Sequence, residues 1–240
     1  MGEINLLNKY PRSKRPIEAR GKRKLSGVGW FHQKPAERDS SEILFENKLL
    51  AVVRQFGKEY FDGDRLYGYG GYYYDPRFWT ETVKRFQEHY KLRGDASILD
   101  VGCAKGFMMH DFKKLMPEAD IRGTDISQYA HDAAIDDMKH LMTVGNAEKL
   151  PYPDNSFDLV ISINTIDNLP LEECKQALKE IMRVAKKDIF ISVHAWRNNR
   201  EKERLLKWNV TALTTMHVKD WKKLFKEVGY KGDYWWFIAE

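Results

Sequence analysis

The chain has 240 residues, of which 42% are hydrophobic, and it carries a net charge of +5. This length and apolar content predict a folded protein with a substantial core. The sequence shows no apolar run of about 18 residues and no apolar signal-peptide core, so we expect no membrane span and a cytoplasmic location. Two cysteines, Cys103 and Cys174, are too few for a disulfide framework or a zinc site, and no other metal-ligand pattern stands out.

Residues 1–40 read as an irregular, basic leader. Residues 1–38 contain ten Lys or Arg against three Glu, whereas the rest of the chain is nearly neutral. A basic arm can bind the phosphates of a nucleic acid. A solvated extension is the simpler interpretation of the same charge run.

Residues 41–94 are predicted to form N-terminal helices around a loop. Apolar residues at helical spacing favour one helix from Ser40 and Ser41 to about Phe56, and Thr80 is the expected N-cap of another. The intervening stretch "YFDGDRLYGYGGYYYDPRFW" is too rich in Gly, Asp and Tyr for a regular helix. Its glycines could let a lid move over a ligand, and its tyrosines could equally form a packing layer.

From residue 95 to residue 240 the sequence alternates between strand and helix patterns. Short apolar runs separated by amphipathic helices predict βαβ units, and thus a Rossmann-like, doubly wound, mostly parallel α/β sheet. Ligands bind such sheets outside the carboxyl ends of the strands. The expected strands are Ile98–Val101, Ile121–Thr124, Leu141–Val144, Leu159–Ile163 and Ile189–Val193, and the expected helices are Phe107–Leu115, Ser127–His140, Leu171–Val184 and a further helix within Trp196–Met216.

The stretch "ILDVGCAKGF", residues 98–107, reads as a strand that runs into a tight turn. Gly102, Ala104 and Gly106 are small residues at every second position, which lets the backbone approach a ligand closely. Phe107 stands where a phosphate-binding loop has its lysine, so that kind of loop is excluded. Asp100 would repel a pyrophosphate but would suit a ligand with an ammonium group. An amino acid joined to a nucleoside therefore fits the turn better than a phosphate does.

Two polar residues after the next strands favour a nucleoside ligand. Asp125 ends the second strand, where a carboxylate can accept both hydroxyls of a ribose. Asn146 follows the third strand, and its amide can both donate to and accept from an adenine edge. Each signal is weak alone, but their order and spacing are specific in combination.

Four stretches resemble successive motifs of the class I S-adenosylmethionine-dependent methyltransferases: "ILDVGCAKGF", "GTDIS", "GNAEKLPYPDNSFDLVIS" and "ALKEIMRVAKK". The resemblance covers about residues 95–193 and is closest to the small-molecule branch with a type 11-like domain. The family's terminal helix and strand are expected in "VKDWKKLFKEVGYKGDYWWFIA". The resemblance implies the seven-stranded sheet of that family, an N-terminal helical extension, and S-adenosylmethionine as the cofactor.

The resemblance also assigns cofactor contacts residue by residue. The turn after the first strand would lie under the methionine part, Asp125 at the ribose, and the residues after the third strand at the adenine. Ala104 replaces the family's middle glycine, and Asn146 replaces its usual aspartate near adenine. With Asn164, which follows the fourth strand, the expected cofactor-binding residues are Asp100, Gly102, Cys103, Ala104, Gly106, Asp125, Ile126, Asn146, Ala147 and Asn164.

Other polar residues are candidates for contact with the substrate. His194 follows the fifth strand and could be a general base, because an unperturbed histidine pKa of about 6.5 suits proton transfer. A structural histidine at a strand end is the alternative. Asp167 could face the substrate or cap the next helix. Tyr73 and Tyr74 offer rings and hydroxyls, and Arg77 could bind a carboxylate or a phosphate.

The sequence therefore predicts methyl transfer to an O or N atom of a small metabolite, with saccharides and phosphorylated or nucleotide-linked intermediates as candidate acceptors. Two alternatives stay open. The basic leader favours an RNA or other nucleic-acid methyltransferase, although the slightly acidic body does not. A protein that binds S-adenosylmethionine without catalysis is the other alternative. A homodimer is also compatible with the sequence.

Overall fold

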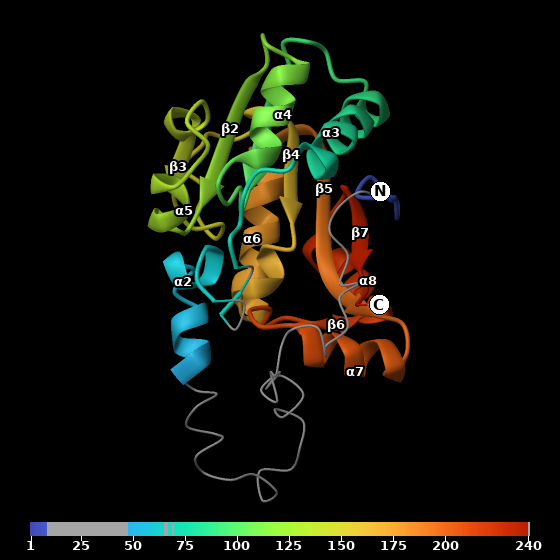
Figure 1. Cartoon of the computed structure of the whole chain (residues 1–240). Helices are drawn as coiled ribbons and strands as arrows, with labels where there is room; N and C mark the ends of the chain where they lie inside the picture. Colours follow the sequence, from blue (N-terminus) through green and yellow to red (C-terminus); the bar gives the residue numbers. More distant parts are fainter. Residues whose placement is uncertain (9–47, 65–66, 69, 240) are drawn as a thin grey trace, which may run out of the picture.

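The computed structural model describes residues 1–8, 48–64, 67–68 and 70–239 (Figure 1). In this part of the chain seven strands form one sheet in the order β3-β2-β1-β4-β5-β6, with β7 paired to β5, and every pairing is parallel. The doubly wound sheet predicted from the sequence is thus confirmed. The strands are β1 (Ser97–Val101), β2 (Asp120–Asp125), β3 (Met142–Val144), β4 (Phe157–Ile163), β5 (Ala185–Trp196), β6 (Met216–His217) and β7 (Asp233–Phe237).

The strand order reverses between β1 and β4. β1 pairs with β2 on one side and with β4 on the other, and Asp100 stands opposite both Gly123 and Ile161. Connections that leave β1 and β4 in opposite directions open a crevice at the carboxyl ends of these strands. The fold therefore places a ligand site directly after Val101.

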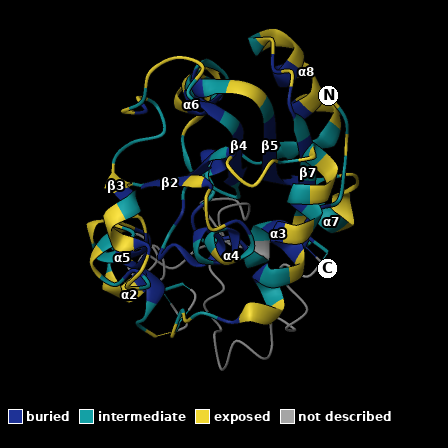
Figure 2. Cartoon of the chain, turned by 90° about the horizontal axis from the view of Figure 1, so that it is seen from above, coloured by how far each residue is buried: buried dark blue, intermediate teal, exposed yellow. Residues whose placement is uncertain are grey.

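Helices cover both faces of the sheet. Because side chains alternate along a strand, Leu99 and Val101 pack on one face and Ile98 packs on the other. Figure 2 shows dark blue, buried strands between helices whose outer surfaces are yellow and exposed. The first face carries α6 (Leu171–Val184) and α8 (Val218–Val228), and the second carries α3 (Pro76–Tyr90) and α4 (Phe107–Leu115). The other helices are α2 (Lys58–Phe61), α5 (Gln128–Asp132) and α7 (Asn199–Trp208).

Two predicted helix boundaries are wrong. α3 begins at Pro76 rather than after Thr80, because the Asp75 carboxylate accepts the N–H of Arg77 and the proline ring suits the first helical position. The helix expected over Ser127–His140 ends at Asp132, and only a 3-10 turn follows at Lys139–Leu141. The N–H of Ile135 donates instead to the carbonyl of Lys105, so a tertiary contact replaces the helical hydrogen bond.

The N-terminal segments are described in part. Residues 1–8, which the sequence assigned to an irregular leader, lie beside β7: Glu3 forms a parallel bridge with Tyr234, and Leu6 and Leu7 are buried. The rest of the basic leader lies outside the described residues, as does the start of the helix expected to reach Phe56, of which residues 48–53 are helical. No helix in the described ranges combines the length and the apolar character needed to cross a membrane.

Candidate functional site

A pocket opens at the carboxyl ends of β1, β2, β3 and β4. Its wall is built by the turns that follow these strands and by side chains from residues 56–79. Apart from Gly106, all of the residues expected to bind the cofactor line this pocket: Asp100, Gly102, Cys103, Ala104, Asp125, Ile126, Asn146, Ala147 and Asn164. The fold thus brings together residues that are up to 64 positions apart in the sequence.

The turn between β1 and α4 explains the spacing of small residues. Gly102, Ala104 and Gly106 have φ angles of 84°, 49° and 78°, so every second residue is left-handed. The N–H of Gly102 donates to the carbonyl of Thr124 at 2.7 Å, which ties the turn to β2. A Cβ at Gly102 would overlap the side chain of Thr165. Ala104 holds a conformation that is unfavourable for a residue with a side chain, and such strain is concentrated at functional sites.

We expect Gly102→Ala to abolish binding of S-adenosylhomocysteine in calorimetry. The new methyl group would push Thr165 into the pocket and strain the turn. Gly229→Ala is the matched control, because Gly229 also has a positive φ, of 73°, but has nothing within 4 Å of the added Cβ. Equal affinity of both variants would contradict the close approach at Gly102.

Asp125 connects the turns after β1 and β2. Its Oδ2 accepts the N–H of Ala104 at 2.8 Å, and its Oδ1 accepts the N–H of Ser127 at 2.9 Å. Burial raises the pKa of this carboxyl above its ordinary value, against the effect of these backbone hydrogen bonds. The next residue, Ile126, leaves 55% of its large apolar side chain exposed at the pocket. A flat apolar group bound beside Asp125 would cover the exposed side chain of Ile126.

Asp100 is a buried carboxylic acid at the floor of the pocket. Burial, and then the charge of Asp125, raise its pKa to about 8. Within the described residues no donor is hydrogen-bonded to its carboxylate, although the group is only 6% exposed. A buried carboxyl without a partner fits a ligand that brings a positive charge.

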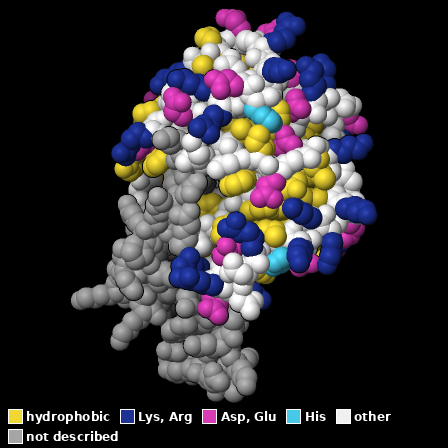
Figure 3. All heavy atoms as spheres, turned by 90° about the vertical axis from the view of Figure 1, so that its right-hand side faces the viewer, with side chains coloured by type: hydrophobic (Ala, Val, Ile, Leu, Met, Phe, Trp, Pro, Cys, Tyr) yellow, Lys and Arg dark blue, Asp and Glu magenta, His cyan; other side chains and the backbone are white. Residues whose placement is uncertain are grey.

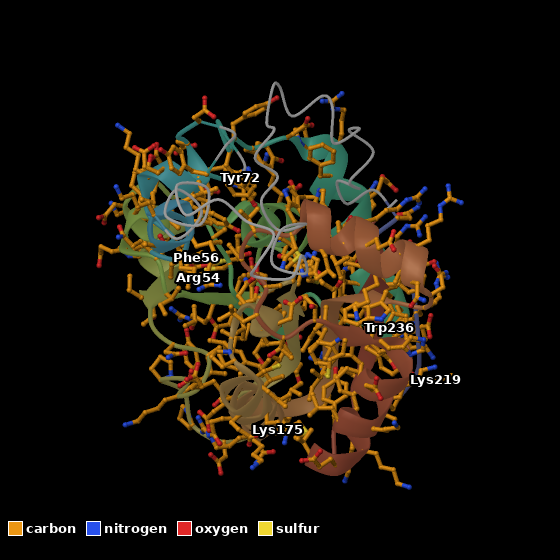
Figure 4. The ribbon with its side chains drawn as sticks, turned by 90° about the horizontal axis from the view of Figure 1, so that it is seen from below. Arg54, Phe56, Tyr72, Lys175, Lys219 and Trp236 are labelled. Atoms are coloured by element: carbon orange, nitrogen blue, oxygen red, sulfur yellow. The ribbon has the colours of Figure 1, made fainter. Side chains whose placement is uncertain are left out.

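Five aromatic side chains, which we call the aromatic wall, close another part of the pocket: Phe56, Tyr60, Phe61, Tyr72 and Trp79. The rings of Phe61 and Tyr72 lie 5.8 Å apart, and Figure 4 shows Phe56 and Tyr72 on the α2 side of the molecule, away from Trp236. The sequence pointed to residues 60–79, which contain four of these five rings, as a lid or packing layer. Their spacing has no helical or strand period, so only the fold reveals which of them face the pocket.

These residues fit S-adenosylmethionine. Asp100 suits its ammonium group, Asp125 suits the ribose hydroxyls, and Ile126 with Asn146 suits the adenine ring. The described lining contains two carboxylates and no Lys or Arg, which disfavours a phosphate-bearing cofactor.

Comparison with known proteins agrees with this geometry. Residues 99–193 match the family model described as "Methyltransferase domain". Residues 99–193 therefore form a methyltransferase domain of the class I S-adenosylmethionine-dependent type. The described sheet has the strands and flanking helices of that family, and the fold named from the resemblance is confirmed.

Individual relatives cover part of the chain. A protein named as a methyltransferase in Schizosaccharomyces pombe is 31% identical over 140 residues, which are 51% of this chain and 49% of that protein. A tRNA (carboxymethyluridine(34)-5-O)-methyltransferase of Arabidopsis thaliana is 32% identical over 126 residues, 52% of this chain and 30% of that protein. A chain in the complex between the Haloferax volcanii Trm112 methyltransferase activator and a methyltransferase shares the fold, with a TM-score of 0.52, 19% identity and coverage of 80% of this chain and 76% of that one. This chain therefore spans half or less of the length of the two curated relatives.

His194 and Asp167 form a buried pair next to the pocket of this methyltransferase domain. Asp167 Oδ2 lies 2.5 Å from His194 Nδ1 and also accepts the N–H of His194 at 2.8 Å. The His194 ring packs against Trp208 and Phe237, with centroids 5.4 and 5.0 Å away. His194 Nε2 has no hydrogen-bond partner in the described structure, and neither residue lines the pocket.

Asn164 joins the pocket to strand β5, which carries His194. Asn164 lines the pocket with a φ of 51°, and its Oδ1 accepts the hydroxyl of Ser192 at 3.0 Å. Ser192 and His194 lie on the same face of β5, two residues apart. Ser192 thus ties Asn164 to the strand that carries His194, and within the described residues no hydrogen bond joins Ser192 to His194.

The remaining predicted substrate residues lie away from the pocket lining. Tyr73 is 74% exposed. The hydroxyl of Tyr74 donates to Asp111 at 2.6 Å, and burial raises its pKa. Arg77 is paired with Asp75, and its side chain is 80% exposed. From residues 60–79, the aromatic residues that reach the pocket are instead Tyr60, Phe61, Tyr72 and Trp79.

Proposed function

We propose that the protein transfers a methyl group from S-adenosylmethionine to an oxygen or nitrogen atom of a small metabolite. The observation that carries this proposal is the buried Asp100 carboxyl, which accepts no hydrogen bond from the described residues, in a pocket that Asp125 also lines. When bound, S-adenosylmethionine supplies a methyl group already activated on a sulfonium. The protein then has to hold the acceptor atom in line with that group.

The described lining favours a neutral, hydroxylated acceptor such as a saccharide over a phosphorylated one. Asn164, Thr165 and Asn168 provide amide and hydroxyl groups, while Trp79 and Leu169 provide apolar surface. Such side chains can hydrogen-bond hydroxyls and pack on a ring face. A phosphate would have no Lys or Arg partner among these lining residues.

Transfer of a labelled methyl group tests this proposal. We would incubate the protein with methyl-labelled S-adenosylmethionine and panels of neutral saccharides, phosphorylated saccharides and amines, after calorimetry with S-adenosylhomocysteine. Label in the neutral saccharides is the expected result. A protein that does not bind S-adenosylhomocysteine at all would overturn the cofactor assignment, and a protein that binds it without transfer to any acceptor would favour the non-catalytic alternative.

We further propose His194 as the general base for an oxygen acceptor, acting through a bridging water because His194 does not line the pocket. The Asp167 carboxylate accepts a hydrogen bond from Nδ1–H of a neutral His194, which leaves Nε2 as the proton acceptor. We expect His194→Gln to lower kcat by about 100-fold or more and to leave the affinity for S-adenosylhomocysteine unchanged. His140→Gln, on the exposed 3-10 turn, is the control. An unchanged kcat in His194→Gln would point to an acceptor that needs no base, such as a neutral amine.

Methylation of RNA is the second candidate function. It is favoured by the Arabidopsis thaliana relative, whose name specifies a tRNA substrate, and by the basic leader. On the face shown in Figure 3, acidic side chains lie among the basic ones, which is unlike a continuous basic footprint. RNA binding that weakens steeply with salt, together with labelled RNA in the transfer assay, would favour this candidate over the metabolite.

A further inference from the structure

Polar contacts fasten the aromatic wall to the turns that line the pocket. Asp62 directly follows α2, and its Oδ1 accepts the N–H of Tyr72 at 2.9 Å. Its Oδ2 accepts from Lys105 Nζ at 2.5 Å and from the hydroxyl of Tyr129 at 2.7 Å. Lys105 also donates to the carbonyl of Tyr72 at 2.8 Å. Asp62 is therefore the point at which two parts of the wall, α2 and Tyr72, meet the body of the domain.

Lys105 is a buried cation inside the β1–α4 turn. Its side chain is only 8% exposed, and Nζ lies 5.9 Å from the ring centroids of both Tyr72 and Tyr129. Burying an ammonium group is unfavourable unless an opposite charge and hydrogen bonds compensate. Burial alone would raise the pKa of Asp62, but the hydrogen bonds from Lys105 and Tyr129 outweigh it and the pKa lies below its ordinary value. The Asp62 carboxylate is thus the opposite charge beside Lys105, and their contact compensates the burial of both groups.

A second contact joins the wall to the turn after β2. The hydroxyl of Ser127 donates to the carbonyl of Phe56 at 2.5 Å, and Ser127 also donates its N–H to Asp125. Figure 1 shows α2 beside α5, which begins directly after Ser127. The wall therefore rests on the same two turns that contribute Ala104 and Asp125 to the pocket.

A ligand in this pocket would touch both the aromatic wall and the turn between β1 and α4. Phe61 and Tyr72 of the wall and Gly102 and Ala104 of the turn line the same pocket. The position of the wall and the burial of the ligand are then coupled, because releasing the ligand past the wall requires the wall to move.

We infer that the ion pair between Asp62 and Lys105 is the latch that keeps the aromatic wall closed over bound cofactor, and that Asp62 is a positioning residue for cofactor retention. This inference rests on the proposed function, since it takes the ligand to be S-adenosylmethionine or its product. Opening the wall breaks the ion pair and leaves Lys105 without its counter-ion, so the latched state lengthens the residence of the ligand.

The test measures dissociation of S-adenosylhomocysteine by stopped flow in the full chain. We expect Asp62→Asn and Lys105→Met each to speed dissociation by about tenfold or more, and the double variant to be no faster than the faster single one. Tyr129→Phe removes one hydrogen bond to Asp62 at a less buried site and should give a smaller increase. Asp95→Asn is the matched control, because it breaks an ion pair with Arg93 on the exposed surface.

Hydrogen exchange separates a latch from a general loss of structure. In the wild type, S-adenosylhomocysteine should slow exchange at residues 57–64 and at the N–H of Tyr72, whereas in Asp62→Asn only the protection of the β1–α4 turn should persist. Dissociation and exchange that match the wild type in both Asp62→Asn and Tyr129→Phe would overturn the latch. If the wild type does not bind S-adenosylhomocysteine, the proposed function fails first, and that outcome is distinguishable from a wild type that binds with no effect of Asp62.

Discussion

Asp125→Ala is expected to weaken the binding of S-adenosylhomocysteine by about 100-fold or more. The carboxylate is the acceptor available for the two ribose hydroxyls, and hydrogen bonds to a charged acceptor are the stronger kind. The substitution also removes the acceptor of the N–H groups of Ala104 and Ser127, so two turns lose their common anchor. Calorimetry of the purified variant measures the loss directly.

Asp120→Asn is the matched control for this experiment. Asp120 lies at the opposite end of β2, where it is exposed and paired with Arg122. We expect it to bind like the wild type. The affinity of Asp125→Asn should lie between those of Asp125→Ala and the wild type, because an amide keeps one acceptor atom but loses the charge. If Asp125→Ala kept wild-type affinity while folded, the ribose would have to bind elsewhere.

The gathering of the expected cofactor-binding residues at one pocket could be predicted from the sequence because its determinants are local. Gly102, Ala104 and Gly106 stand in one turn, and that turn needs left-handed residues at those positions. Asp125 could be placed because a parallel sheet brings the carboxyl end of each strand to the same edge. The chemistry of these residues then follows from their position alone.

The side chains that complete the pocket could not be predicted in the same way, because their positions depend on contacts between distant segments. Tyr73, Tyr74 and Arg77 follow one another closely in a loop, and a sequence does not specify which side chain of a loop turns inward. Tyr72 reaches the pocket because Lys105 and Asp62 hold its backbone, from 33 and 10 residues away. His194 was expected to follow a strand that ends at Val193, but β5 runs on to Trp196 and His194 lies inside it, paired with Phe237 of β7. Its burial beside Trp208 depends on where α7 packs. The early end of α5 has the same origin, in the contact between Ile135 and Lys105.

We expect the affinity for S-adenosylhomocysteine to increase with pH between pH 6 and pH 8. Asp100 has a pKa of about 8 in the unliganded protein, because of burial and of the charge of Asp125, so it is mostly neutral at pH 6. A bound ammonium group favours the carboxylate form, and binding below pH 8 therefore releases a proton. The dissociation constant should fall by at most tenfold per pH unit in this range. Calorimetry in buffers of different ionisation enthalpy counts the protons released.

Asp100→Asn should flatten this dependence, bind more weakly than the wild type at pH 8 and approach it at pH 6. The slope that is left would belong to Asp125, whose pKa burial also raises. An unchanged slope in the variant would mean that another group titrates on binding.

The Asp100 carboxyl should also make the unliganded fold less stable as the pH rises. The folded-state pKa of Asp100 is above its ordinary value of 3.8, so its contribution to stability is fully present below that value and is lost as the pH rises through about 8. The thermal unfolding midpoint of the unliganded wild type should therefore decrease as the pH rises from 5 to 8. The midpoint of Asp100→Asn should decrease less and should be higher than that of the wild type at pH 8. Saturating S-adenosylhomocysteine should reverse that order, because only the wild type then gains a partner for the buried charge. A carboxyl that costs stability when the pocket is empty and stabilises the complex is what a site for a cationic ligand requires. A merely structural Asp100 would give the same order of midpoints with and without the ligand.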